Sequence, residues 1–253
     1  DTFNVSTTAA FVVAGAGVPV AKHGNRAISS QCGSADVLAE LGVNLDVPPE
    51  VVEDCVQEAG IGFLFAPRLH PAMKHAMGPR RELGVRTIFN MLGPLTNPAG
   101  ARSQIIGVFA PELTETFAQV LRLLGSRHAF IVHGHDGMDE ITVTAPTRVS
   151  ELADGQVKTY DLDPLRYIGE YAGADEIAGG DPAENAKILR SVLAGDKGAR
   201  RDITCLNAAA AIVAGGKAGT MDEGWEQAAA SIDEGRAAKA LEGLIEGTAP
   251  SSS

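Results

Sequence analysis

Positively charged side chains gather in one short stretch of the chain, VAKHGNRAISSQCGSAD. Lys22, His23 and Arg26 follow an apolar segment, residues 18–21, that is typical of a short buried strand. Small residues come next in the same stretch: Gly24, Ser29, Ser30, Gly33 and Ser34. Ligands bind beyond the carboxyl ends of strands in open α/β sheets, and phosphate oxygens suit backbone N–H groups beside a cation. We therefore predict a phosphate site here and favour it over a solvated basic loop.

A second candidate lies at the start of the chain, where Asn4-Val5-Ser6-Thr7 opens a predicted helix at residues 7–16. A helix N-terminus offers free N–H groups and the positive end of its dipole to an anion. Asparagine, serine and threonine are also ordinary N-cap residues, because their side-chain oxygens accept from those N–H groups. Taken alone, the segment favours the ordinary cap. Ser34 begins another predicted helix, which would bring a second N-terminus to the phosphate site.

Acidic residues follow a predicted strand in the sequence HGHDGMDE. Asp139 and Glu140 are adjacent there, and Mg²⁺ takes one or two carboxylates together with waters and substrate phosphates. The alternative is an acidic turn, since adjacent acids alone are a weak signal. His133 and His135 suggest a transition metal, but the sequence shows no third convergent ligand, so we rank magnesium above it.

The middle of the chain carries further charges and several prolines. Arg80 could hold a carboxylate through two parallel hydrogen bonds, which lysine does less well. Without other support, this region and the nearby His70 favour an ordinary surface helix. In RTIFNMLGPLTNP, Pro94 and Pro98 exclude a continued helix or a central strand. That segment is either a loop that lines a pocket or a simple connector.

The composition indicates a globular protein with a sizeable core. Of the 253 residues 45% are apolar, and a chain of this length needs no disulfide or metal for stability. No apolar run approaches the roughly 20 residues that span a bilayer, and DTFNVSTTAA lacks the basic start of a signal peptide. A net charge of −11 repels nucleic acids and anionic lipids. We expect neither partner, and an anionic substrate would need a local cationic pocket or a bound metal.

The cysteines indicate the redox compartment. Cys32, Cys55 and Cys205 are widely spaced and odd in number, and no metal-binding spacing is present. Neither a disulfide framework nor a zinc site is expected. This cysteine usage is typical of a reducing environment, so we expect a cytoplasmic protein.

The elements that must position these residues read as an α/β pattern. Short apolar runs alternate with helical stretches, and such a strand–helix–strand order predicts parallel pairing. An Asp-Gly pair within residues 149–162 predicts a β-hairpin. The expected strands are residues 18–21, 61–65, 104–109 and 129–133. The expected helices are residues 7–16, 34–41, 49–59, 112–124, 182–193, 204–214, 221–232 and 235–245, followed by a disordered tail at 249–253.

Five stretches, in this order, resemble characteristic motifs of the anthranilate phosphoribosyltransferase family. They are TFNVST, KHGNR-x-x-SS-x-x-GSAD, GFLFAP-x-x-HPAM, RTIFN-x-LGPLTNP and DGMDEI. The resemblance extends over nearly the whole chain. It implies a catalytic domain at residues 1–248, of the nucleoside phosphorylase and phosphoribosyltransferase type. That domain is a mostly parallel sheet flanked by helices, with a small β-hairpin excursion.

The resemblance also implies a second domain. Residues 67–85 would contribute to a small helical domain that otherwise lies upstream, and through which the family usually dimerises. A glycine-rich phosphoribosyl-pyrophosphate loop of the form GTGGD is expected just before Asp1. Because that loop and most of the small domain are absent from this sequence, we expect this piece alone not to turn over substrate.

The implied activity is that of a glycosyltransferase (a pentosyltransferase) of tryptophan biosynthesis. It joins the amine of anthranilate to C1 of 5-phosphoribosyl 1-pyrophosphate (PRPP) and releases pyrophosphate. By motif match, Lys22, Arg80, Asp139 and Glu140 would be catalytic, and Asn25, Arg80 and His70 would contact anthranilate. Ser6 would help hold one of two expected Mg²⁺ ions, and Asp139 with Glu140 the other. PRPP would lie against Thr2, Asn4, Val5, Ser6, Thr7, Lys22, His23, Gly24, Asn25, Arg26, Ala27, Ile28, Ser29, Ser30 and Ser34.

Three alternative interpretations stay open at this point. One is a pyrimidine nucleoside phosphorylase of the same fold, which would use inorganic phosphate without a magnesium pair. Another is a non-catalytic, nucleic-acid-binding relative, against which the net charge of −11 argues. The last is an inert folded core that binds neither substrate.

Overall fold

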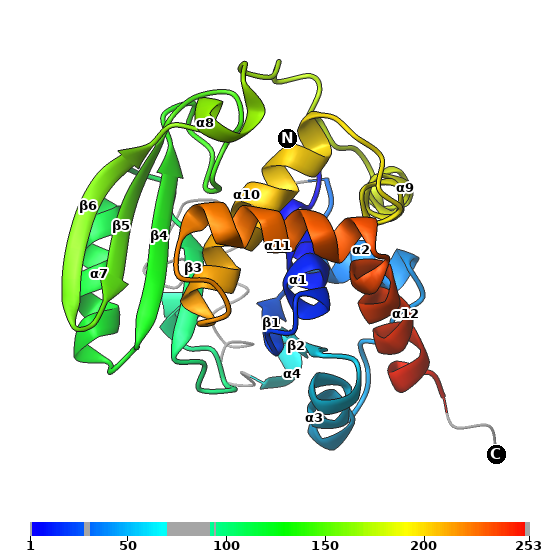
Figure 1. The fold of residues 1–253 in the computed structure, drawn as a ribbon. Coiled ribbons are helices and arrows are strands. Elements are labelled where there is room, and N and C mark those ends of the chain that lie inside the picture. Colours follow the sequence, from blue (N-terminus) through cyan, green and yellow to red (C-terminus); the bar gives the residue numbers. More distant parts are fainter. Residues whose placement is uncertain (1, 28–30, 70–91, 94, 251–253) are drawn as a thin grey trace, which may run out of the picture.

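The computed structural model describes residues 2–27, 31–69, 92–93 and 95–250. Figure 1 shows two adjoining halves, each with its own sheet. Helix α10 (Ala199–Ala214) lies between them and contacts both the helices of one half and the sheet of the other. This arrangement of helices against sheets confirms the expected α/β class.

The larger sheet contains four strands in the order β3-β4-β5-β6. β3 and β4 are parallel and are connected by α7, as the strand–helix–strand pattern predicts. β4, β5 and β6 are antiparallel, so the sheet is mixed in the described residues and the hairpin is an integral part of it. Their bounds are β3 (Ser103–Gly107), α7 (Leu113–Leu123), β4 (His128–Gly134), β5 (Thr147–Ala153) and β6 (Gln156–Leu162).

The predicted hairpin forms at the predicted dipeptide. Ala153 pairs with Gln156, which leaves Asp154 and Gly155 as a two-residue turn. Both have positive φ angles, 50° and 73°, as a type I′ turn requires. This turn matches the right-handed twist of the strands and fixes the register of β6 on β5.

The second sheet consists of the parallel strands β1 (Val20–Gly24) and β2 (Ile61–Phe65). The sequence predicts that the first strand ends at residue 21, and that boundary is wrong: Lys22 and His23 lie within β1. They pair with Phe63 and Leu64, so the apolar partner strand extends the ladder past the point where the polar residues begin. The helices that connect or follow these strands are α2 (Ser34–Glu40), α3 (Pro49–Glu58) and α4 (Ala66–Leu69).

Helix α1 (Val5–Gly15) is central to the helical half and is buried on all sides from Thr7 to Ala14. Its sequence, VSTTAAFVVAG, has no polar face, which is typical of a helix surrounded by other elements. It packs mainly against α10 and α12. The other helices of the described residues are α8 (Leu165–Ile168), α9 (Pro182–Leu193), α11 (Met221–Asp233) and α12 (Arg236–Thr248).

Cys32, Cys55 and Cys205 are buried free thiols. Burial raises the pKa of the Cys205 thiol to about 12, so this thiol is inert at neutral pH. In the part of the chain that the structure describes, no helix is long and apolar enough to cross a membrane.

Helix α10 begins five residues before its predicted start because a buried arginine anchors its first turns. Arg201 is 5% exposed and donates two hydrogen bonds to Asp233 of α11, at 2.7 and 2.8 Å. Replacing Asp233 by asparagine is expected to destabilise the protein by about 1–2 kcal/mol at pH 7, because hydrogen bonds to a charged, buried guanidinium are lost. The expected loss is this small because half of the Asp233 side chain is solvent-exposed, and water screens its charge. Thermal and urea unfolding would measure it.

The same substitution has an expected pH signature. Arg201, aided by Lys197, lowers the pKa of Asp233 to about 2, compared with about 3.9 in an unfolded chain. The pair therefore stabilises the fold above pH 4, and this stabilisation is lost as the pH falls towards 2. Glu242→Gln, which removes the exposed pair with Arg190, is the control and should lose less than about 1 kcal/mol. Equal losses in the two variants would contradict the prediction.

Candidate active site

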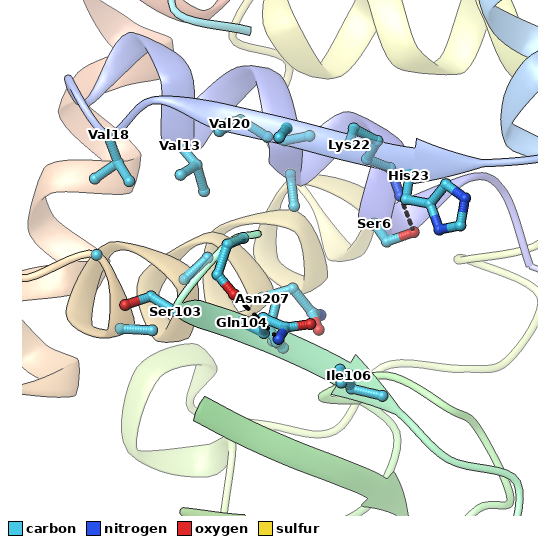
Figure 2. Close-up of a pocket in the computed structure, with 18 of the residues that line it drawn as sticks. Ser6, Val13, Val18, Val20, Lys22, His23, Ser103, Gln104, Ile106 and Asn207 are labelled. Atoms are coloured by element: carbon cyan, nitrogen blue, oxygen red, sulfur yellow. Dashed lines mark hydrogen bonds between the residues drawn. The ribbon is translucent and has the colours of Figure 1, made fainter. Parts of the chain in front are cut away.

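A cavity of about 370 Å³ lies between strands β1 and β3, with α1 and α10 on its wall (Figure 2). Four side chains singled out from the sequence line it: Ser6, Lys22, Asp139 and Glu140. They come from the first turn of α1, the middle of β1 and the loop that follows β4. His23 lines it as well. The cation, the hydroxyl and the carboxylates that the sequence associates with a sugar diphosphate and a metal therefore share one cavity.

Lys22 and Glu140 are electrostatically coupled across this cavity. The Lys22 ammonium donates to the Ser6 hydroxyl at 3.3 Å. Burial and the neighbouring Asp139 raise the pKa of Glu140 to about 8, although Lys22 and the Ser6 backbone N–H oppose that rise. Burial also lowers the pKa of Lys22, which Glu140 partly offsets. Burial therefore disfavours the charged forms of both groups, and a polyanion bound together with a divalent cation would stabilise both.

The acidic pair is held in place by close backbone packing. A Cβ at position 107, the last residue of β3, would lie 1.6 Å from the Asp139 carbonyl oxygen. Only glycine lets the loop after β4 pass this closely over the end of β3. This approach places the loop where Asp139 and Glu140 line the cavity.

Asp136 organises the same loop from within. Its carboxylate accepts from the Met138 backbone N–H at 3.0 Å and from the Thr142 hydroxyl at 2.6 Å, and it also accepts from the Thr144 hydroxyl. Burial would raise the pKa of Asp136, but these donors outweigh it and the pKa is lowered. The carboxylate therefore stays ionised and fixes both sides of the loop that carries Asp139.

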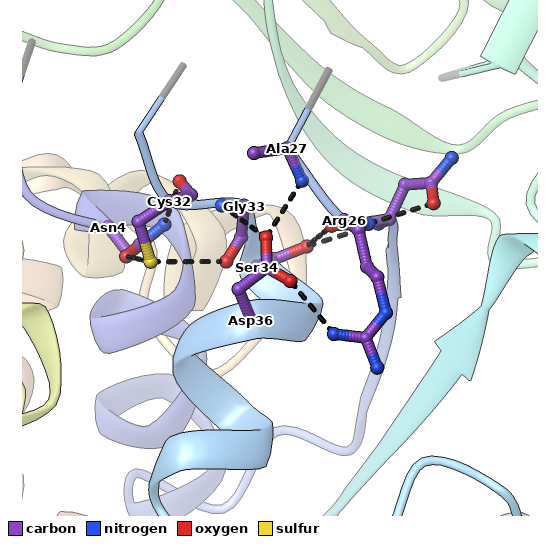
Figure 3. Close-up of polar contacts among 8 residues, drawn as sticks. Asn4, Arg26, Ala27, Cys32, Gly33, Ser34 and Asp36 are labelled. Carbon is purple, nitrogen blue, oxygen red and sulfur yellow. Dashed lines mark hydrogen bonds and ion pairs between the residues drawn. The ribbon is translucent and has the colours of Figure 1, made fainter. Parts of the chain in front are cut away.

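The described parts of the phosphate-site stretch, on either side of residues 28–30, meet at Asp36 of α2 (Figure 3). One Asp36 oxygen accepts from the backbone N–H groups of Ala27 and Gly33, at 2.8 and 3.0 Å, and the other accepts from Arg26 at 2.9 Å. Ser34 adds contacts to the main chain of Asn25. Burial would raise the pKa of Asp36, but these donors lower it. Arg26 is thus the partner of Asp36 rather than a free cation.

Sequence reasoning did not identify Asp36 as a functional residue. Its signal is present all the same: an acidic residue at the third position of a helix accepts from the free N–H groups of the first turn. The pattern GSAD before a predicted helix therefore contained the information. What it did not contain is that Ala27 and Arg26 would lie close enough to use the same carboxylate.

Asn4 does not act as the ordinary helix cap that its position favours. It occupies the N-cap position of α1, but its side chain makes no capping hydrogen bond. Instead, Asn4 Nδ2 donates to the Cys32 carbonyl at 3.2 Å, and Asn4 Oδ1 accepts from Asn185 of α9 at 3.0 Å. The side chain therefore ties the far end of the phosphate-site stretch to two helices.

The other proposed PRPP contacts that the structure describes do not line the cavity. Thr2 forms an isolated bridge with Ala178, Val5 is a core residue, and Gly24 lies against Ser34. Thr7 is buried, and its hydroxyl has no hydrogen-bond partner within the described ranges. Five candidates lie outside the residues that the structure describes: Ile28, Ser29, Ser30, His70 and Arg80.

Asn97 shows which of the two interpretations holds for the end of the segment RTIFNMLGPLTNP. It lines the cavity, and its Nδ2 donates to the Ala21 carbonyl of β1 at 3.0 Å. The end of this segment is therefore a pocket-lining loop, as one of the two interpretations proposed. Residues 86–91 and 94 lie outside the described part of the chain.

The donor set of the cavity fits magnesium better than a transition metal. Ser6, Asp139 and Glu140 offer oxygen atoms, the ligands that Mg²⁺ takes together with waters and phosphates. His133 instead donates from Nδ1 to the Val108 carbonyl at 2.8 Å, and His135 pairs with Asp161. Among the described residues, no group of three His, Cys, Asp or Glu side chains could hold a metal. A metal here would need substrate oxygens to complete its coordination.

Comparisons with known proteins agree with one another. Residues 1–238 match the family described as glycosyl transferase family, a/b domain. The chain is 62% identical over 248 residues to an anthranilate phosphoribosyltransferase of Desulfosudis oleivorans, covering 98% of this chain and 73% of that protein. A Syntrophobacter fumaroxidans protein of the same name is 62% identical over 244 residues, covering 96% of this chain and 72% of that protein.

Solved structures show the same likeness. Anthranilate phosphoribosyltransferase from Thermus thermophilus superposes with a TM-score of 0.90 at 45% identity, covering 98% of this chain and 74% of that one. The Saccharomyces cerevisiae enzyme, solved in complex with PRPP and Mg, gives 0.88 at 34% identity, with 98% and 70% covered. These likenesses do not favour the phosphorylase or nucleic-acid-binding alternatives. The chain belongs to the anthranilate phosphoribosyltransferase family.

Proposed function

We propose that this protein transfers the phosphoribosyl group of PRPP to the amine of anthranilate and releases pyrophosphate, a step of tryptophan biosynthesis. The observation that carries the proposal is the convergence of Ser6, Lys22, Asp139 and Glu140 on one cavity. A helix N-terminus, an ammonium group and two carboxylates suit a diphosphate that binds together with a divalent cation. The names of the relatives support the same reaction.

The reacting centre dictates what the site must do. When C1 of the ribosyl group loses pyrophosphate, positive charge grows on the sugar and negative charge grows on the leaving group. Fixed cations and N–H donors in a site with little water stabilise such charge most effectively. In our proposal Lys22 and the first turn of α1 face the phosphates, and Asp36 holds the main chain at Ala27 and Gly33 beside them.

Magnesium would supply Lewis-acid stabilisation of the leaving diphosphate. We propose two ions, one held with the help of Ser6 and the other by Asp139 and Glu140. The oxygen donors on the cavity wall support this assignment. Burial and the neighbouring Asp139 raise the pKa of Glu140, and a bound cation would stabilise both carboxylates in their charged form. The yeast relative solved with PRPP and Mg supports the choice of metal.

Anthranilate needs positioning more than activation. An aromatic amine is nucleophilic in its neutral form, so the proposal includes no strong general base, and holding the amine near C1 accounts for much of the rate. Asn25, His70 and Arg80 are the proposed contacts, with Arg80 pairing the carboxylate. A yeast relative solved with 4-fluoroanthranilate supports a site for this class of acceptor.

Replacing Arg80 by alanine tests the carboxylate contact. The KM for anthranilate is expected to rise by roughly 10- to 100-fold, because a charge-assisted, two-pronged hydrogen bond is lost, while the KM for PRPP changes little. Steady-state kinetics with each substrate varied in turn would measure both. Arg81→Ala is the neighbouring control. If the anthranilate KM stays unchanged in Arg80→Ala, the residue does not belong to the site.

The proposal also includes a cellular compartment and an oligomeric state. We propose a cytoplasmic protein, which the three free, buried thiols support, and a homodimer. Analytical ultracentrifugation would decide the oligomeric state, and a protein that sediments as a monomer at micromolar concentration would remove the dimer.

The function itself is tested by following anthranilate fluorescence. The protein at its full natural length should consume anthranilate only when PRPP and Mg²⁺ are both present. Cleavage of thymidine by inorganic phosphate, with anthranilate left untouched, would replace the proposal with the nucleoside phosphorylase alternative.

A further inference from the structure

A buried asparagine on helix α10 binds the main chain directly beside the acidic pair. Asn207 is 2% exposed and lines the cavity. Its Oδ1 accepts from the Ile141 backbone N–H at 3.0 Å, and its Nδ2 donates to the Ile141 carbonyl at 2.8 Å. Ile141 follows Glu140 immediately, yet it is 66 residues from Asn207 in the sequence.

This contact takes the place of the backbone hydrogen bonds that a neighbouring strand would otherwise make with Ile141. Ile141 lies between β4 and β5 and is fully buried, so its N–H and C=O have neither strand partners nor access to water. Leaving buried backbone groups unpaired destabilises a fold, because they lose their hydrogen bonds to water and gain none in return. An asparagine amide offers one donor and one acceptor in the same plane, as a peptide group does, and so it satisfies both groups of Ile141 at once.

The hydrogen bonds of Asn207 are committed to protein atoms. Its second Nδ2 hydrogen goes to the Ile203 carbonyl of α10, at 2.8 Å. Both donors are therefore used, and the amide has no hydrogen left to give to a ligand in the cavity. Asn207 holds the loop relative to α10, while Gly107 holds it relative to β3.

We infer that Asn207 is a positioning residue for the metal-binding carboxylates. It fixes the backbone next to Glu140, and so it sets the directions in which Glu140 and Asp139 present their oxygens without touching metal or substrate itself. This inference rests on the proposed function of the cavity. Outer partners of this kind typically change metal affinity by about 10- to 100-fold when removed.

The test uses two substitutions in the protein at its full natural length. Asn207→Leu keeps the approximate volume and leaves both Ile141 groups unpaired. Asn207→Ser, whose hydroxyl is too short to reach both groups, leaves room for water and keeps the test possible if the leucine variant does not fold. Thr248→Val is the control, because it removes a buried hydroxyl that binds the main chain at Asn44 and Leu244, away from the cavity.

Metal affinity is measured without the reaction. Mn²⁺ binding in the presence of pyrophosphate, followed by electron paramagnetic resonance, should weaken by about 10- to 100-fold in both Asn207 variants and stay unchanged in Thr248→Val. In kinetics, the Mg²⁺ concentration for half-maximal activity should rise in parallel. The kcat at saturating Mg²⁺ should recover, and the anthranilate KM should stay constant.

The outcomes separate the inference from the proposed function. A folded Asn207 variant that binds Mn²⁺ as tightly as the wild type would overturn the inference. Wild-type protein that binds Mn²⁺ and pyrophosphate but ignores anthranilate would overturn the proposed reaction, and weaker Mn²⁺ binding in the variants would still support the role of Asn207. A wild type that binds no Mn²⁺ with pyrophosphate would overturn both.

Discussion

Replacing Asp139 by asparagine and Glu140 by glutamine in one protein is expected to lower turnover by about 10³-fold at physiological Mg²⁺. Both side chains line the cavity with Lys22 and Ser6. The amides keep the size of the side chains but lose the charge that holds a divalent cation. Turnover should depend much less on Mg²⁺ concentration. The unfolding midpoint should not fall, because the substitution removes a carboxylate whose pKa is raised by burial and by the neighbouring Asp139.

The chain supplies a matched control for this substitution. Met-Asp-Glu occurs at residues 138–140 and again at residues 221–223. The second copy forms the first turn of α11, where Asp222 pairs with Arg166 and Glu223 accepts from the Gly219 N–H. Asp222→Asn with Glu223→Gln should leave the Mg²⁺ dependence unchanged. Normal activity of the 139/140 variant at limiting Mg²⁺ would remove that pair from the metal site.

A single methyl group at position 107 is expected to reduce activity by about 100-fold. The added Cβ of Gly107→Ala would lie 1.6 Å from the Asp139 carbonyl oxygen, so the loop must move. A displacement of about 1 Å in positioned groups is enough to lower rates by about 10²-fold. The loss should appear in kcat and in the Mg²⁺ requirement, with a destabilisation of about 1–3 kcal/mol.

Gly219→Ala is the control for this second prediction. Gly219 is exposed before α11, and a Cβ there would meet its nearest neighbour, the Glu223 carboxylate, at 3.4 Å. That is an ordinary van der Waals contact, so activity should be retained. Wild-type kinetics in Gly107→Ala would show that the loop tolerates movement, and the account of how the carboxylates are positioned would then be wrong.

The sequence by itself determined the local elements and the chemical inventory of the site. Apolar GFLF between glycine and proline predicted β2 with the correct bounds, and Asp154-Gly155 predicted the hairpin turn. Such signals are local, because they depend on residue preferences within a few positions. Five motifs in order also predicted the family, and Lys22, Ser6 and the acidic pair as its cavity residues.

Only the tertiary structure decided which of these residues work together. Pairing with β2 extends β1 to include Lys22 and His23. Arg26 donates to Asp36 and so has a structural role. Asn207 reaches Ile141 across 66 residues, a contact that no periodicity or spacing encodes. The two copies of Met-Asp-Glu are equivalent as local sequence, and only one of them lies on the cavity. The physical reason is that packing between distant segments, such as Gly107 against Asp139, sets where a side chain points, whereas local preference sets only the element on which it lies.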